Sequence, residues 1–194
     1  MKKKKPLRIV FNAPVVLTFC LLAAAALIIN ILTGGQSNRY VFSVYRASLR
    51  DPLTYVRFFT HVLGHGSYSH LIGNLMMILV IGPVLEDKYG SSAIFRVILI
   101  TALITGVVHF VFFPRVALLG ASGIVFAFIL LASAIGFKDR EIPISFILVA
   151  ILYIGEQIYE GLFVSDNVSQ LTHILGGIVG AVTGYLWRKP ARRK

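Results

Sequence analysis

The sequence predicts an all-α membrane protein with six transmembrane helices, and its composition, hydropathy and charge distribution support the membrane class. Apolar residues make up 57% of the 194 residues and charged residues only 14%, against about 25% in soluble domains. The mean hydropathy of +0.81 is too high for a disordered chain. The net charge of +11 is concentrated at both ends of the chain, which is typical of cytoplasmic termini rather than of a nucleic-acid-binding surface. The single cysteine, Cys20, excludes a disulfide scaffold.

A helix needs about 20 apolar residues to cross a bilayer, and six stretches approach or reach that length. The first follows the basic segment 1–13 and resembles a signal peptide. Because its apolar core is long and more spans follow, we interpret it as a retained anchor. In chain order the predicted spans are Pro14–Leu32, Tyr68–Leu85, Ser92–Phe113, Gly120–Gly136, Ile142–Ile158 and Ser169–Trp187.

The distribution of Lys and Arg predicts the orientation of these spans. An even number of spans puts both termini on one side, together with segments 86–90 and 137–141, and that side carries 14 Lys and Arg residues if Arg96 is included. The other side carries five, namely Arg39, Arg46, Arg50, Arg57 and Arg115. By the positive-inside rule, segments 1–13 and 188–194 are cytoplasmic. We expect an integral protein of a prokaryotic plasma membrane, with no extra folded domain at either end.

The segment 33–67, between the first two predicted spans, has an unusual composition. Its apolar runs are too short to cross a bilayer, and it is too apolar to be disordered. Aromatic residues and arginines are mixed in it, as in Val56-Arg57-Phe58-Phe59. Such a composition suits a segment that lies among lipid headgroups, and long loops of this kind are usually functional. The sequence therefore predicts a membrane-embedded first loop.

Three polar sites lie inside predicted spans, where polar groups are costly and indicate function. His70 and Asn74 share one face of the second helix. Ser122 opens the fourth helix and His173 lies near the start of the sixth. At about 1.5 Å per residue, Ser122, His70 and His173 lie ~21, ~24 and ~22 Å from the cytoplasmic ends of their helices. All three helices thus place a polar group at one level of the ~30 Å apolar core, near its outer surface.

These residue types indicate acyl-transfer chemistry. A serine hydroxyl becomes a nucleophile when a base accepts its proton, and we expect His173 to be that base for Ser122. The stripe Gly176, Gly180 and Gly184 follows His173 on its helix and lets the backbones of the fourth and sixth helices approach closely. Ser122 lies at a helix N-terminus with free N–H donors. Such donors stabilise an oxyanion.

Asn74 and His70 add side-chain donors to this predicted site. We assign no Asp or Glu as a third member, so we predict a Ser-His dyad. Each feature also has a structural reading, because glycines and serines are common at tight helix contacts and a His/Asn pair at a helix end can simply be hydrated. We interpret His109, near the outer end of the third helix, as structural.

In chain order, His70-Leu-Ile-Gly-Asn74, Gly120-Ala-Ser122-Gly123 and His173-Ile-Leu-Gly176 resemble the motifs of the rhomboid family of intramembrane serine proteases, with similarity from Arg57 to Gly184. The resemblance implies a six-helix rhomboid-like protease domain over 14–187. It implies that Ser122 is the nucleophile, that His173 is the general base, and that His70, Asn74 and the Ser122 N–H form the oxyanion hole. It implies no metal and no cofactor. The supporting residues implied are Gly120, Gly123, Phe126, Gly176 and Arg57, the last of which orders the first loop.

Three positions depart from the family pattern. Val56 precedes Arg57 where the family often has tryptophan, and Thr172 replaces a common alanine before the histidine. Phe126 stands where many members carry a tyrosine that packs on the histidine, and it can stack but not hydrogen-bond. The family also has an acidic residue and a glycine after the second helix, matched here by Glu86 and Gly90.

The expected function is hydrolysis of peptide bonds in or near transmembrane segments of single-span or polytopic membrane proteins, at a site that opens to the outside. One alternative is a catalytically inactive rhomboid-like protein that binds membrane clients, which would be marked by loss of the serine or the histidine. Another is a metal site or transporter built from His61, His65 and His70, since imidazole suits zinc or copper. The chain has no His-Glu-x-x-His motif to favour the latter.

Overall fold

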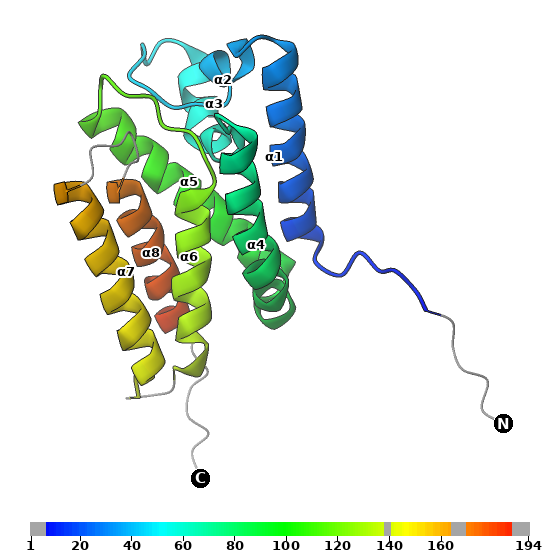
Figure 1. The fold of residues 1–194 in the computed structure, drawn as a ribbon, viewed down its shortest axis with the longest axis vertical. Helices are drawn as coiled ribbons and strands as arrows, with labels where there is room; N and C mark the ends of the chain where they lie inside the picture. Colours follow the sequence, from blue (N-terminus) through cyan, green and yellow to red (C-terminus); the bar gives the residue numbers. More distant parts are fainter. Residues whose placement is uncertain (1–6, 138–140, 164–169, 188–194) are drawn as a thin grey trace.

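The computed structural model describes residues 7–137, 141–163 and 170–187. Over these ranges the chain is helical and has no β-strand, only isolated bridges such as the pair Val44 and Leu118. The long helices run side by side, and short helices cover one end of the bundle (Figure 1). The basic residues predicted to be cytoplasmic at 1–5, 138, 140 and 188–194, and the predicted start of the sixth span at Ser169, lie outside the described residues.

The helices follow the order of the predicted spans. They are α1 (Pro14–Leu32), α2 (Gln36–Tyr40), α3 (Pro52–Thr60), η1 (His61–Leu63), α4 (Tyr68–Tyr89), α5 (Ser91–Phe112), α6 (Ser122–Ser133), η2 (Ala134–Gly136), α7 (Ile144–Phe163) and α8 (Gln170–Leu186).

Several helix boundaries differ from the sequence prediction; α7, for example, runs from Ile144 to Phe163 rather than from Ile142 to Ile158. The helix α4 continues four residues beyond Leu85, so 86–89 are helical rather than a loop. It ends where Gly90 adopts a φ of +84°, because the charged residues before it are good helix formers and only the glycine breaks the helix. The helix α6 begins at Ser122, not at Gly120, because Gly120 has a φ of +127° that a helix does not accept.

The chain is an integral membrane protein. Three of its described helices, α1, α4 and α5, are long and apolar enough to cross a membrane. The apolar helical stretches Ser122–Gly136 and Ile144–Tyr159 are shorter, so the crossing of α6, α7 and α8 stays a prediction. Many large apolar side chains on the outside of the bundle are exposed, among them Leu152 and Val80, as expected of a surface covered by lipid.

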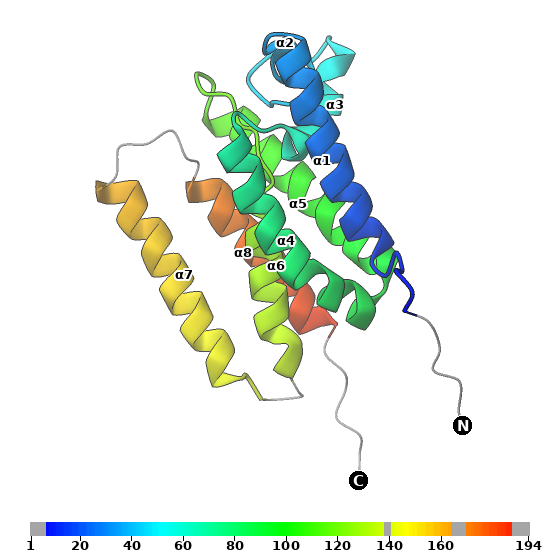
Figure 2. The same cartoon turned by 45° about the vertical axis from the view of Figure 1, so that its right-hand side comes forward.

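The helix α6 lies at the centre of the bundle. It packs against α8, α4, α5 and α7, and Ile124, Ala127, Phe128 and Leu131 on it are fully buried. Segment 7–13 and the end of α8 lie at the same end of the bundle, opposite α2 and α3 (Figures 1 and 2). The start of α6 points towards the end covered by α2 and α3, so Ser122 is placed near the segment predicted to face outside.

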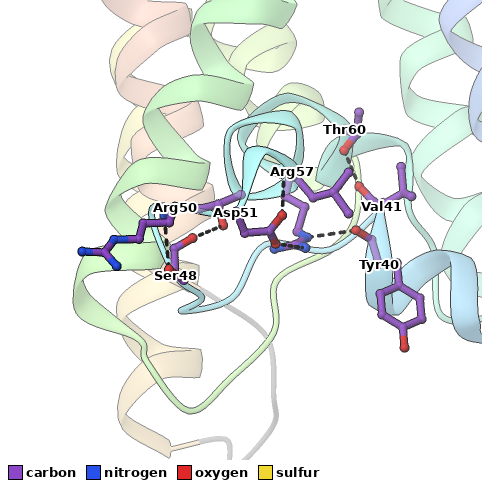
Figure 3. Close-up of polar contacts among 9 residues, drawn as sticks. Tyr40, Val41, Ser48, Arg50, Asp51, Arg57 and Thr60 are labelled. Carbon is purple, nitrogen blue, oxygen red and sulfur yellow. Dashed lines mark hydrogen bonds and ion pairs between the residues drawn. The ribbon is translucent and has the colours of Figure 1, made fainter.

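Arg57 in α3 ties the first loop together. Its Nε donates to the Tyr40 carbonyl oxygen at 2.9 Å, and its Nη2 pairs with Asp51 Oδ2 at 2.9 Å (Figure 3). The guanidinium also lies 4.8 Å from the Tyr45 ring centroid. Asp51 caps α3 by accepting from the Leu53 N–H, and that bond, with the Arg57 contact, lowers the pKa of the Asp51 carboxyl. The predicted ordering role of Arg57 thus has a structural basis in its contacts, while the embedding of this loop in the membrane stays a prediction.

The first loop also holds the segment that leads into α6. The backbones of Val44 and Leu118 exchange two hydrogen bonds of 2.9 Å, and the Gly120 N–H donates to the His61 carbonyl oxygen at 3.0 Å. All of these donors and acceptors are main-chain groups. They fix the backbone at Leu118 and Gly120, which lie four and two residues before Ser122.

A buried carboxylate caps the start of α1. Pro14 has no N–H, and the next two N–H groups, of Val15 and Val16, donate to the two oxygens of Glu86 at 2.9 Å each. Glu86 is buried at the end of α4. The N-cap residue, Ala13, has no side-chain acceptor, so the Glu86 carboxylate takes that role. Its negative charge is also favourable at a helix N-terminus.

We expect Glu86→Ala to destabilise the protein by about 2 kcal/mol, because the N–H groups of Val15 and Val16 lose their acceptor. Thermal unfolding in detergent measures this, with Asp87→Ala as the matched control, since Asp87 is the exposed neighbour on the same helix. Equal unfolding temperatures for the two variants would contradict the capping role.

Candidate active site

Ser122 and His173 are in hydrogen-bond contact. Ser122 is the first residue of α6, and its Oγ lies 2.8 Å from His173 Nε2 on α8. His173 is buried and Ser122 is partly buried. The contact predicted between residues 51 positions apart is therefore present, and its geometry is that of a hydroxyl next to its base.

Glycines allow α8 to approach α6 this closely. A Cβ on Gly176 would overlap the carbonyl oxygen of Gly123, and a Cβ on Gly180 would overlap that of Ala127. One turn further on, a Cβ on Gly184 would overlap the side chain of Ala134. The two helices thus pack backbone against backbone along the stripe predicted from the sequence.

The start of α6 offers main-chain donors. Its N-cap is Ala121, and no side chain caps the helix. The first N–H groups of a helix have no acceptor within it, so the N–H groups of Ser122 and Gly123 are available to a ligand carrying negative charge. This is the arrangement that an oxyanion hole requires.

His70 and Asn74 on α4 border the same point. A Cβ on Gly120 would lie 2.9 Å from His70 Nε2 and 3.9 Å from Asn74 Nδ2. Gly120 thus meets two demands that only glycine satisfies together, a φ of +127° and the absence of a side chain beside the His70 ring. The structure thus places His70 and Asn74 beside Gly120, two residues before Ser122, and their role in an oxyanion hole stays a prediction.

His65 holds the Asn74 amide in place. Asn74 Nδ2 donates to His65 Nε2 at 3.1 Å, and His65 Nδ1 donates to the Leu63 carbonyl oxygen at 3.1 Å. Burial lowers the pKa of His65 to about 4, so near neutral pH its ring is uncharged and Nε2 can accept. Asn38 Nδ2 donates to the His65 carbonyl oxygen at 2.9 Å. The sequence interpretation gave His65 no role outside a rival metal site and missed this contact.

Two residues of α7 complete the surroundings of His173. The Phe126 ring lies between the His173 ring, at 4.5 Å, and the Tyr153 ring, at 4.4 Å. Gln157 Oε1 lies 2.7 Å from His173 Nδ1. The sequence interpretation found no carboxylate as a third member and overlooked this amide. Gln157 is a strongly polar residue inside the fifth predicted span, so the rule that singled out Ser122 and His173 also applied to it.

Two histidines of the rival metal site, His61 and His65, form hydrogen bonds through their rings. His61 Nδ1 lies 3.1 Å from the Arg57 carbonyl oxygen, and its Nε2 lies 3.3 Å from Thr105 Oγ1. Burial lowers the pKa of His61 to about 4. Within the ranges that the structure describes, no group of three or more His, Cys, Asp or Glu could hold a metal ion.

Comparison with known proteins gives the family. A family model described as the rhomboid domain matches residues 52–190, which is more than half of the chain. The chain belongs to the rhomboid family.

The relatives of this rhomboid chain come from animals and bacteria. It is 33% identical over 158 residues to Rhomboid-related protein 2 of Mus musculus, covering 71% of this chain and 52% of the relative. It is 28% identical to Rhomboid-related protein 1 of Caenorhabditis elegans, covering 67% and 39%. Identity to Rhomboid protease GlpG of Haemophilus influenzae is 27%, covering 67% and 68%. The chain thus spans about half or less of the length of the first two relatives.

We expect Gly176→Ala to lower both stability and the reactivity of Ser122, because the new methyl group forces α8 away from the Gly123 carbonyl and stretches the Ser122–His173 contact. Overpacking of this kind costs about 1–3 kcal/mol. The measurements are thermal unfolding and the rate of labelling by a serine-reactive fluorophosphonate.

Gly155→Ala on α7 is the matched control. Nothing lies within 4 Å of a Cβ at Gly155, so alanine there should keep or raise stability, by up to about 1 kcal/mol. Labelling of Gly176→Ala at the rate of this control would refute the requirement for close packing.

Proposed function

We propose that this rhomboid is an intramembrane serine endopeptidase that hydrolyses peptide bonds in or near transmembrane segments of membrane proteins. The observation that carries the proposal is the 2.8 Å contact between Ser122 Oγ and His173 Nε2 beside an uncapped helix start. A relative of similar sequence is named as a rhomboid protease. No cofactor takes part in the proposed reaction.

The reaction follows from the positions of the donors and acceptors. His173 Nε2 accepts the hydroxyl proton as Ser122 Oγ attacks the scissile carbonyl carbon. The negative charge that develops on the carbonyl oxygen is stabilised by the Ser122 N–H, the Asn74 amide and the His70 ring. The His173 imidazolium then protonates the leaving amine, and it later activates the water that hydrolyses the acyl-enzyme.

The proposed protease domain comprises six membrane-crossing helices over 14–187 with an embedded first loop. Both termini are cytoplasmic, in the plasma membrane of a prokaryote, and the site opens to the outside. This topology is supported by the position of segment 7–13 and the end of α8 at one end of the bundle, with α2 and α3 at the other (Figure 1). The excess of basic residues at the chain ends has the sign that the positive-inside rule requires.

The proposed substrates are single-span or polytopic membrane proteins that enter laterally from lipid between α4 and α7. The helix α7 stands at the edge of the bundle, with an apolar outer face (Figure 2). A helical substrate must unwind before Ser122 reaches its carbonyl, since its own hydrogen bonds and side chains shield the amide. Helix-weakening residues near the scissile bond would therefore favour cleavage.

We expect Ser122→Ala to abolish cleavage of a single-span reporter by the purified protein, because the nucleophile is removed. Product formation in detergent or in liposomes is the measurement, with Ser133→Ala as the control, since Ser133 lies at the other end of α6. Undiminished cleavage by Ser122→Ala would refute the assignment of Ser122 as the nucleophile. No cleavage by the wild-type protein would favour a client-binding protein without catalytic activity.

We expect Asn74→Ala to lower kcat by about 10²–10³-fold, the loss seen when one oxyanion donor is removed. Labelling of Ser122 by a fluorophosphonate should stay detectable, since the serine and histidine are untouched. Steady-state cleavage and labelling are measured on the same preparation. Complete loss of labelling would instead indicate a structural role for Asn74.

A further inference from the structure

We propose that Gln157 is a positioning residue that holds His173 in the tautomer a general base needs. This inference rests on the proposed protease function. Gln157 Oε1 lies 2.7 Å from His173 Nδ1, and the Gln157 side chain is only 2% exposed. It lies on α7, a different helix from either member of the dyad.

The hydrogen-bond roles follow from the chemistry of the amide oxygen. A carbonyl oxygen accepts but never donates, so with this amide orientation the proton of the neutral ring is on His173 Nδ1. The other nitrogen, Nε2, is then unprotonated and faces Ser122 Oγ at 2.8 Å. A base with the opposite tautomer could not accept the serine proton, and holding the tautomer is what the third residue of a catalytic triad does.

Packing keeps Gln157 in this position. Among the α7 side chains that the structure describes, only Tyr153 and Gln157 are buried, and they lie one turn apart on the same face. The Tyr153 ring packs on Phe126, which packs on His173. Gly177 on α8 leaves space for the Tyr153 ring, since a Cβ at Gly177 would lie 2.6 Å from Tyr153 Cε1. The contacts of Tyr153 and Gln157 therefore do two things. They dock α7 on α6 and α8, and they orient the His173 imidazole.

The membrane explains why an amide suits this position. A buried carboxylate must be desolvated, and that penalty is large in a low-dielectric interior. An amide oxygen orients the ring and carries no net charge. It also keeps its hydrogen bond when His173 becomes charged, because Nδ1 is protonated in both states.

The test compares two substitutions in the full chain, with a single-span reporter. Gln157→Leu removes the acceptor at similar size, and Gln157→Glu keeps an acceptor oxygen. We expect Gln157→Leu to lower kcat about 10- to 100-fold, as when a partner that orients a functional histidine is lost, with KM unchanged. Gln157→Glu should recover most of this loss. Glu156→Gln, an exposed neighbour on α7, is the control and should match wild type.

A spectroscopic readout separates this inference from the proposed function. In protein labelled with ¹⁵N-histidine, the His173 signals, assigned by their loss in His173→Asn, should show a protonated Nδ1 and an unprotonated Nε2. This holds in wild-type protein whether or not the reporter is cleaved. Wild-type protein with the proton on Nε2, wild-type kcat in Gln157→Leu, or equal losses in Gln157→Leu and Gln157→Glu would each overturn the inference. Failure of wild-type cleavage alone would overturn the protease function.

Discussion

The backbone-to-backbone approach of α6 and α8 is the constraint on which the site depends. A serine side chain is short, so its hydroxyl reaches an imidazole on another helix only if the two helix axes are unusually close. Gly176 and Gly180 provide this closeness by leaving the carbonyl oxygens of Gly123 and Ala127 uncovered. In lipid such packing also supplies association energy, since no hydrophobic effect drives helices together there. The same stripe therefore stabilises the bundle and forms the Ser122–His173 contact.

The first loop, segment 33–67, also positions the site, through hydrogen bonds to the chain before α6 and to Asn74. Its backbone fixes the approach to α6 through Val44 and His61, and the His65 ring orients Asn74 from a position outside the helices. Arg57 stabilises the loop itself through Tyr40 and Asp51. The proposed oxyanion hole thus depends on a segment that contributes none of its donors. A structural change in this loop would shift Asn74 and the start of α6 through these hydrogen bonds.

Several buried polar side chains that the structure describes have a hydrogen-bond partner of the opposite character. Glu86 accepts from the start of α1, His65 accepts from Asn74, and Gln157 accepts from His173. Where water is excluded, an unmatched donor or acceptor is expensive. Neutral partners surround the proposed dyad, whereas the charged Glu86 lies at the end of its helix.

The sequence by itself determined the helical membrane class and the order of the helices. It also singled out Ser122, His173, His70 and Asn74 as candidate site residues, because polar residues in apolar helices stand out in composition and spacing. It also predicted the close approach of α6 and α8, since small residues at helical spacing permit little else. Only the tertiary structure brought Gln157 to His173 and His65 to Asn74. Those contacts depend on how α7 and the first loop dock, and docking is set by side-chain packing between segments far apart in the chain, which local periodicity does not encode.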